Sequence, residues 1–182
     1  MTFRRWLYIA VGLFVVGLLL GMVLPAGAIA DELSVFDNVA DDAASITGLG
    51  LFFFILIRNI IAFLTAFFFS PLLLLVPIGS LVLNGAVISV VSRLVLQDQS
   101  VGFLIAGIMP HGIIEIPAYI FVQAAALGFG FTVLRGLFKS DYRDRVKPEL
   151  KANLRRLGIA VMLLIPAAFI ESFVTPVLLN LF

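Results

Sequence analysis

Long apolar runs with very few charged residues dominate this chain and restrict what it can fold into. About 20 consecutive apolar residues are needed to cross the roughly 30 Å hydrocarbon core of a bilayer. Five stretches approach or exceed that length, at residues 6–28, 50–69, 72–96, 101–134 and 157–181. Because backbone amides inside a bilayer must be hydrogen-bonded within the protein, each stretch is predicted to be helical. The sequence therefore predicts one all-α, multi-pass membrane domain over residues 1–182, with about five transmembrane helices.

The composition excludes several classes of site. The hydrophobic fraction is 62% and the charged fraction is 13%, whereas soluble domains are about half apolar and a quarter charged. No cysteine is present, which excludes disulfides, thiolate metal sites and a cysteine nucleophile. With a single histidine, histidine-pair zinc motifs are also excluded. We therefore expect no metal, no cofactor and no catalytic residue, and nothing indicates nucleic-acid binding.

The charges are distributed unevenly and predict an orientation. Basic residues precede the first span and fill the connection before the last span, namely Arg4, Arg5, Arg135, Lys139, Arg143, Arg145, Lys147, Lys151, Arg155 and Arg156. The connection after the first span carries only acids, from Asp31 to Asp42. Positive charges stay on the cytoplasmic side, so the N-terminus is expected in the cytoplasm and the C-terminus outside. Residues 139–153 are expected to form a short cytoplasmic helix, with Pro148 marking a helix start.

Two segments before residue 50 have alternative interpretations. The first span, followed by Ala28, Ile29 and Ala30, resembles a signal peptide with its cleavage site. A retained span is favoured, because the apolar run exceeds the length of about 7–15 residues that is usual for signal peptides. Residues 31–49 show apolar positions at helical spacing with acids between them. They fit either an amphipathic helix on the outer surface or a solvated loop.

The fourth stretch, residues 101–134, is too long for one straight span. As a single helix it would measure about 51 Å. Pro110 disfavours helical geometry at the residue before it and suits the first position of a new helix, and Gly112 adds flexibility. The sequence therefore predicts a broken or re-entrant fourth segment around Pro110–Gly112. The short piece before Pro110 is either the outer half of a discontinuous span or a segment at the outer boundary.

His111 and Glu115 are the most unusual residues in that segment. They are spaced i and i+4, which places them on one helix face. Ionisable groups inside a membrane are costly and mark functional sites by default. The pair fits a proton relay or cation site, but a structural polar clasp between helices is favoured, because polar pairs inside membranes often hold helices together.

Polar residues in the other spans are expected to converge on this pair. We hypothesise one central polar cluster of Arg58, Asn59, Asn84, His111, Glu115 and Glu171. In the alternative, Arg58 and Asn59 lie at a headgroup boundary.

One segment carries a family resemblance. Pro110, His111, Gly112, Glu115 and Pro117, followed by an alanine-rich stretch ending in Gly128, resemble the stage II sporulation protein M family. Asn59 and the pair Asn84 and Gly85 look like other marks of that family, although the family often has two asparagines where this chain has Arg58 and Asn59. The resemblance runs from about residue 58 to 135, and more loosely into the last span. It implies a multi-pass integral membrane protein. Endospore-forming bacteria use the family in engulfment with peptidoglycan-degrading partners, and similar proteins occur in organisms that form no spores.

Three functions are compared on these observations. A non-enzymatic scaffold or anchor in the cell membrane, organising other membrane or cell-envelope proteins, is the expected function. The alternative is a transporter or channel-like protein that moves protons, ions or a small solute through the polar cluster. An intramembrane hydrolase has the least support, because no metalloprotease motif or paired catalytic acids appear. Small residues along the fourth span fit either the interior of a monomer or the seam of a homodimer.

Overall fold

The protein is an elongated bundle of helices in a computed structural model that describes residues 2–25, 27, 46 and 48–181, apart from the side chain of His111. Its helices are α1 (Phe3–Val23), α3 (Leu49–Phe68), α4 (Leu75–Asp98), α5 (Val101–Phe138) and α6 (Ser140–Phe169). A π-helical turn (Ile170–Val174) and the short α7 (Thr175–Leu179) continue α6. Within the described residues, five helical segments are long and apolar enough to cross a membrane. The prediction of an all-α membrane fold with five spans is confirmed.

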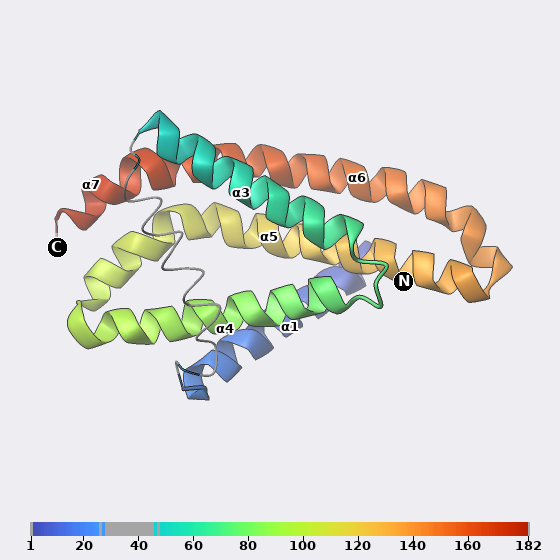
Figure 1. Cartoon of the computed structure of the whole chain (residues 1–182), viewed down its shortest axis with the longest axis horizontal. Coiled ribbons are helices and arrows are strands. Elements are labelled where there is room, and N and C mark those ends of the chain that lie inside the picture. Colours follow the sequence, from blue (N-terminus) through green and yellow to red (C-terminus); the bar gives the residue numbers. More distant parts are fainter. Residues whose placement is uncertain (1, 26, 28–45, 47, 182) are drawn as a thin grey trace.

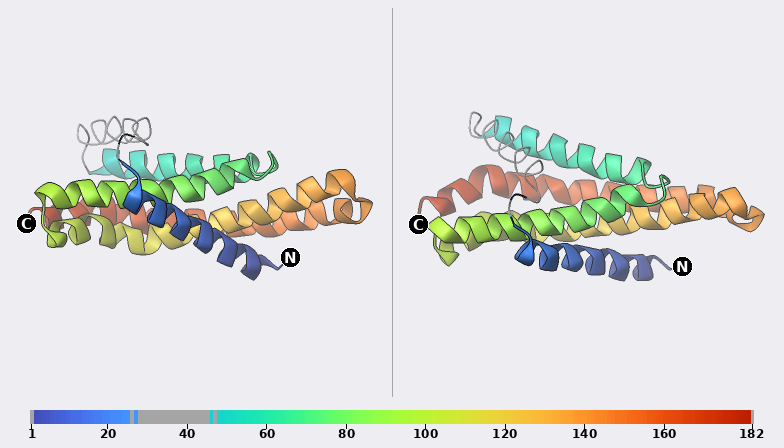
Figure 2. Two further views of the ribbon diagram at one scale, coloured as in Figure 1. Left: turned by 90° about the horizontal axis from the view of Figure 1, so that it is seen from below. Right: turned by 60° about the horizontal axis from the view of Figure 1, so that its bottom comes forward.

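The helices run along one common axis, and α5 lies at the centre (Figures 1 and 2). α5 contacts α1, α3, α4 and α6. The start of α1, the α3–α4 turn and the α5–α6 turn lie toward one end, whereas the α4–α5 turn and α7 lie at the other (Figure 1). Successive spans therefore alternate in direction, as five membrane crossings require.

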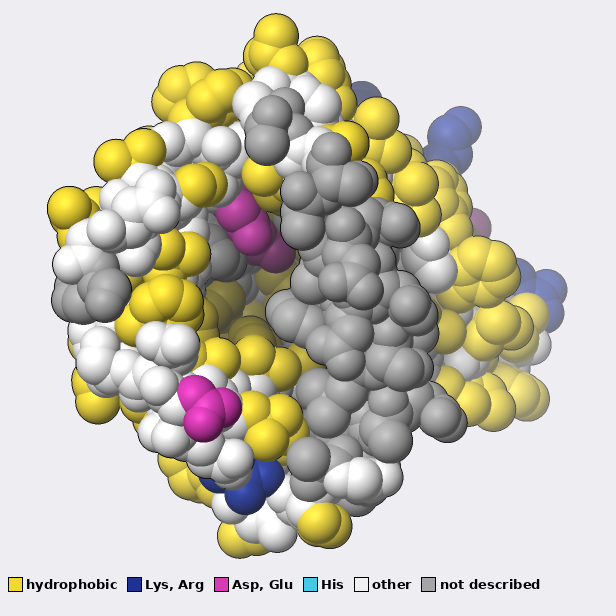
Figure 3. Space-filling model, turned by 60° about the vertical axis from the view of Figure 1, so that its left-hand side comes forward, with side chains coloured by type: hydrophobic (Ala, Val, Ile, Leu, Met, Phe, Trp, Pro, Cys, Tyr) yellow, Lys and Arg dark blue, Asp and Glu magenta, His cyan; other side chains and the backbone are white. Residues whose placement is uncertain are grey.

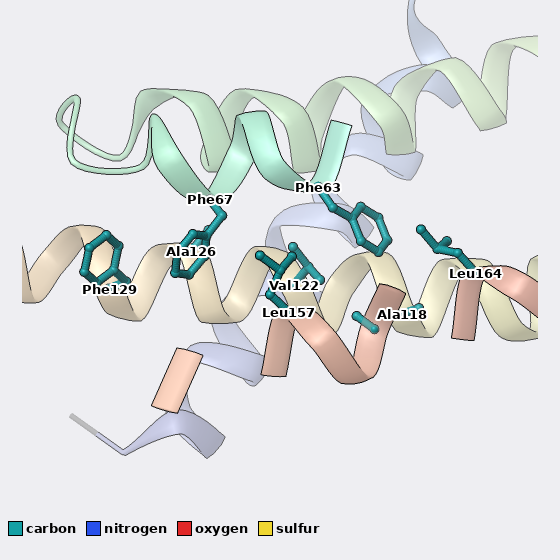
Figure 4. Packing of buried hydrophobic residues seen from close by; sticks show 9 residues of the cluster. Phe63, Phe67, Ala118, Val122, Ala126, Phe129, Leu157 and Leu164 are labelled. Atoms are coloured by element: carbon teal, nitrogen blue, oxygen red, sulfur yellow. The ribbon is translucent and has the colours of Figure 1, made fainter. Parts of the chain in front are cut away.

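Aromatic rings of α3 fill the space above small residues of α5. Phe63 and Phe67 are buried and point toward Ala118, Val122 and Ala126 of α5 (Figure 4). Small side chains allow helix backbones to approach closely, which is how helices associate where no water drives them together. From the other side, α6 completes this cluster with Leu157 and Leu164.

Glycines bring α1 and α4 into backbone contact. A Cβ atom on Gly17 would lie 2.2 Å from the carbonyl oxygen of Val82, and one on Gly85 would lie 2.4 Å from that of Phe14. Gly17 and Gly21 form a GxxxG pair, the spacing that aligns two small residues on one face of a membrane helix. α1 is therefore packed closely against α4 within the bundle.

The turn between α3 and α4 is unusually tight. Leu73 and Leu74 have φ angles of 52° and 61°, in the left-handed region that non-glycine residues rarely adopt. Ser70 is fully buried and donates a hydrogen bond to the carbonyl of Phe67 at 2.7 Å. The turn rests on Gly130 of α5, where a Cβ atom would lie 2.5 Å from the carbonyl oxygen of Ser70.

The structure does not confirm the predicted break at Pro110. The backbone is helical from Val101 to Phe138, with both prolines inside the helix. Ser100 accepts a hydrogen bond from the backbone N–H of Phe103 at 3.1 Å, which caps a helix that begins well before Pro110. A proline inside a helix removes one backbone donor and bends the axis. Accordingly, the first turns of α5 run at an angle to the rest of the helix (Figure 1).

The charged segment before the last span is not a separate short helix. α6 runs without interruption from Ser140 through Pro148 to Phe169. The prediction that Pro148 starts a helix is therefore wrong, because the helix has already begun two turns earlier. The proposed amphipathic helix at 31–49 lies almost entirely outside the described residues.

Candidate functional site

Polar side chains follow one face of α5 through the centre of the bundle. Glu115, Tyr119 and Gln123 continue the i and i+4 spacing that starts at His111, so they share one face of the helix. Ser80 and Asn84 have the same spacing on α4, which packs against α5. The two faces place hydroxyl and amide groups opposite one another in the middle of two apolar helices.

These groups form a hydrogen-bonded network centred on Tyr119. The hydroxyl groups of Tyr119 and Ser80 are 2.7 Å apart, and the side-chain amide of Asn84 donates to the Tyr119 hydroxyl at 3.0 Å. Gln123 donates its side-chain N–H to the Ser80 hydroxyl at 3.2 Å. Asn84 also donates to the backbone carbonyl of Ser80 at 2.9 Å. We call Ser80, Asn84, Tyr119 and Gln123 the Tyr119 network.

Aromatic neighbours fix the position of the Tyr119 ring. Phe14 of α1 and Phe63 of α3 lie with ring centroids 6.4 and 6.3 Å from that of Tyr119. These separations are within the range of favourable aromatic pairs. Tyr119 therefore touches α1, α3 and α4 at once, and its hydroxyl is held in a single direction.

One acceptor of the network remains available. Gln123 is 1% exposed, and its side-chain carbonyl oxygen has no hydrogen-bond partner among the described residues. A buried polar atom without a partner costs about 1–3 kcal/mol. The network can therefore accept one further hydrogen bond, from a water molecule or a polar solute.

A π-helical turn near the C-terminal end of the last span is a second unusual element. Glu171 and Ser172 belong to the π-helical turn Ile170–Val174, which ends two residues before Pro176. Pro176 has no N–H to donate to the preceding turn, and its ring crowds that turn's carbonyl group, which favours a local change of helical register. Thr175 donates its hydroxyl to the carbonyl of Ile170 at 3.4 Å. Short π-helical turns are frequent at functional sites, so Glu171 is a candidate residue on geometric grounds.

The end of the bundle that carries α7 is hollowed. Viewed from this end, the molecular surface shows a depression with an acidic side chain on its wall (Figure 3). Glu115 and Glu171 are both partly exposed. An acidic group in such a hollow can interact with a cation or exchange a proton.

The structure distributes the six predicted site residues over several places. Asn84 belongs to the Tyr119 network, and Glu115 lies one helical turn from Tyr119 on the same face of α5. Glu171 lies in the π-helical turn. The side chain of His111 is outside the description.

The two predicted residues of α3 are not part of the Tyr119 network. Arg58 is exposed and lies about 140° around α3 from the buried Phe63. Asn59 is partly buried on α3. Neither residue takes part in the hydrogen bonds that surround Tyr119.

Sequence reasoning did not identify Tyr119 as a site residue. Its signal was available, because Tyr119 and Gln123 extend the His111 and Glu115 spacing by one and two further turns. Among the described residues, no group of three or more histidines and acids could hold a metal ion.

Comparisons with known proteins agree with the membrane architecture. The family model for stage II sporulation protein M matches residues 10–176. An uncharacterized protein of the archaeon Methanocaldococcus jannaschii is 29% identical over 98 residues, which cover 53% of this chain and 55% of that protein. The chain therefore spans about half the length of this curated relative. No solved structure matches. Since the matched region covers well over half of the chain and most of each of the five spans, the chain belongs to the stage II sporulation protein M family.

Proposed function

We propose that this protein is a non-enzymatic membrane scaffold that holds partner proteins at the surface of the cell membrane. The observation that supports this function is the α5–α6 hairpin, which projects beyond the other helices (Figures 1 and 2). We propose that this end and the N-terminus face the cytoplasm and that the C-terminus is outside, following the positive charges of the hairpin.

The hairpin is longer than a membrane span requires. α5 has 38 residues, and the helical segment Ser140–Leu179 has 40, so each measures about 60 Å against a hydrocarbon core of roughly 30 Å. At the turn, the side chain of Arg143 donates to the carbonyl of Gly136 at 3.0 Å, which ties the two helices together. The projection is thus a stiff pair of helices rather than a loose loop.

The surface of the projection suits protein contacts. Asp144, Lys147 and Lys151 are exposed there and present charges of both signs. Mixed charges of this kind favour selective recognition, because a mismatched partner places like charges together.

Site-specific photocrosslinking tests the scaffold function. A photoreactive amino acid replaces Lys147 on the projection, and the matched control replaces Met162, which is 65% exposed on the apolar part of the same helix. In intact cells, position 147 is expected to give a discrete protein adduct and position 162 to give lipid adducts. For a charge test, the photoreactive amino acid is placed at position 144 instead. There, the double substitution Lys147→Gln and Lys151→Gln should reduce the yield of the protein adduct. Lipid adducts alone at position 147 would contradict the scaffold function.

The alternative function is transport of a proton, an ion or a small polar solute. It is favoured by the available acceptor of Gln123, by the π-helical turn at Glu171 and by the hollow in Figure 3. Purified protein in liposomes would then dissipate an imposed ion or proton gradient faster than empty liposomes. Glu115→Gln and Tyr119→Phe should each slow that flux, whereas Tyr8→Phe on the exposed face of α1 should not. No flux in the wild type, or flux that neither variant changes, would end the transport alternative.

A further inference from the structure

We propose that a pocket between the start of α1 and the α5–α6 hairpin binds the phosphate group of an anionic phospholipid. This pocket is separate from the Tyr119 network, and the proposal does not depend on the scaffold function. The argument rests on the shape of the pocket, its level along the spans and the arrangement of its arginines.

The pocket has a volume of about 80 Å³. One water molecule needs roughly 10–15 Å³ measured in this way, so a phosphate-sized group fits. Three helices contribute its lining, which consists of Phe3, Trp6, Gly128, Phe131, Thr132, Tyr142, Arg145, Glu149, Asn153 and Arg156. Gly128 keeps the floor of the pocket close to Trp6, because a Cβ atom there would lie 3.1 Å from the indole ring.

Its level along the spans matches a membrane boundary. On α6 the charged residues end at Arg156, and the apolar run begins at Leu157. On α5 the apolar run ends before Arg135, and on α1 it begins at Trp6 after two arginines. Tryptophan is enriched at the level of the headgroups. A phosphate of the bilayer therefore lies at the same depth as the pocket.

Aromatic rings hold the arginines in place. The Arg156 guanidinium lies 4.0 Å from the centre of the Phe3 ring, and that of Arg145 lies 5.2 Å from the Tyr142 ring. A guanidinium packed against a ring uses its face for this contact. The N–H groups lie in the guanidinium plane, so they remain able to bind phosphate oxygens.

Asn153 forms hydrogen bonds to both Glu149 and Arg156. It is 1% exposed, donates its side-chain N–H to Glu149 at 3.2 Å and accepts a hydrogen bond from Arg156. Glu149 thus accepts a hydrogen bond from a neutral amide, and no arginine among the described residues forms an ion pair with it. The lining contains two guanidinium groups against one carboxylate, which leaves an excess of positive charge for an anion.

The surroundings favour a lipid over a free anion. Phe3, Trp6 and Phe131 are among the residues that line the pocket, and one exposed face of α1 carries Val11, Val15 and other large apolar residues. A phospholipid can place its phosphate among the arginines and its acyl chains along this face, whereas inorganic phosphate gains only the polar contacts.

Trp6 is the single tryptophan of the chain and lines the pocket, so its fluorescence reports occupancy directly. Full-length protein in a zwitterionic detergent is titrated with a short-chain phosphatidylglycerol, with phosphatidylcholine of the same chain length, and with inorganic phosphate. Phosphatidylglycerol is expected to produce a saturable change, at a concentration at least tenfold lower than either of the other two.

Three variants separate the pocket from general surface charge. Arg156→Gln should weaken phosphatidylglycerol binding by about tenfold or more, the usual effect of losing a hydrogen bond between charged groups. Arg155→Gln is the matched control, since Arg155 is exposed and does not line the pocket, and it should leave affinity unchanged. Glu149→Gln should increase affinity, a gain that a misfolded protein would not show.

Four results would overturn the proposal. Equal losses with Arg155→Gln and Arg156→Gln would indicate general attraction to the basic surface. An equal response to phosphatidylcholine would remove the preference for anionic lipid. Equal affinity for inorganic phosphate would identify a soluble anion as the ligand. Unchanged or weaker binding by Glu149→Gln would show that the pocket does not sense the charge of its ligand.

Discussion

At the scale of single residues, Tyr119 connects three neighbouring helices. Its ring contacts α1 and α3, and its hydroxyl is shared between Ser80 and Asn84 of α4. A hydroxyl in hydrocarbon has little water to bond with, so its partners within the protein determine where the helix can lie.

Removing that hydroxyl should loosen the contact between α4 and α5. Tyr119→Phe is expected to lower the free energy of unfolding by about 0.6 kcal/mol and by no more than about 1.7 kcal/mol, the average and the maximum for hydrogen bonds between membrane helices. The control is Tyr8→Phe, because the Tyr8 hydroxyl is exposed and bonds only to the nearby Arg4 among the described residues. Equilibrium unfolding in mixed micelles measures both, and equal effects would contradict a special role for Tyr119.

The backbone of the α3–α4 turn provides a second prediction. Leu73 is 70% exposed and has a φ of 52°, a conformation that costs a non-glycine residue roughly 1–2 kcal/mol. Leu73→Gly should therefore raise the unfolding free energy by about 1 kcal/mol.

Leu72→Gly provides the control for this effect. Leu72 is 58% exposed and has no positive φ, so glycine only adds flexibility there and should be destabilising. Unfolding curves of the two variants, measured under the same conditions, test this prediction. A loss of stability in both variants would contradict the proposed strain at Leu73.

Sequence reasoning found some residues of the site and missed others for a physical reason. The cost of an ionisable group in a membrane drew attention to His111, Glu115, Glu171 and Arg58. A tyrosine carries no such cost, so Tyr119 was overlooked. Arg58 was expected either to face the other charges or to lie at a headgroup boundary. In the structure it is exposed on α3, whose residues Phe63 and Phe67 pack inward.

At the scale of elements, the glycines of α1 and α4 determine how closely these helices pack. Gly85→Ala should destabilise the protein by about 1–3 kcal/mol, because its new methyl group would meet the backbone of α1. Gly79→Ala on the same helix meets nothing within 4 Å and should be neutral or stabilising by up to about 1 kcal/mol.

The same comparison can be made on α1. Gly17→Ala should destabilise the protein, whereas Gly12→Ala, which also meets nothing within 4 Å, should not. Thermal unfolding of the four variants in one detergent measures these effects. A destabilising Gly12→Ala or Gly79→Ala would show that helix flexibility, rather than close approach, requires the glycines.

Span positions were predictable, whereas span boundaries at prolines were not. Hydrophobic length located all five spans, since the requirement to cross a bilayer is strict. Pro110 did not end α5, because the helix is capped at Ser100 and proline inside a membrane helix bends it without unfolding it. Pro148 did not start α6, because the charged residues around it are themselves good helix formers.

At the scale of the whole molecule, five alternating spans place the hairpin and the α4–α5 turn on opposite sides of the membrane. The chain contains no cysteine, so single introduced thiols report their side without background. In sealed vesicles of known orientation, Lys147→Cys should react with an impermeant maleimide only from the cytoplasmic side. Gln99→Cys, next to the α4–α5 turn, should react only from the outer side. Labelling of both from one side would contradict this topology.

The pocket beside Trp6 belongs to this scale as well, which is why the sequence did not indicate it. Its walls come from residues 3–6, 128–132 and 142–156. Each of these segments contains only residue types that are common at the membrane–water boundary. The packing of α1 against the hairpin brings the segments together.

The projecting hairpin also has a practical consequence for imaging. A chain of 19.8 kDa that lies wholly within a detergent belt gives electron micrographs few features for aligning particles. In the proposed topology the α5–α6 projection would extend past that belt, and Arg143 ties its two helices together at the turn. An antibody fragment raised against the exposed face of residues 140–152 would therefore sit rigidly on the protein. Its orientation would reveal the orientation of the bundle beneath it.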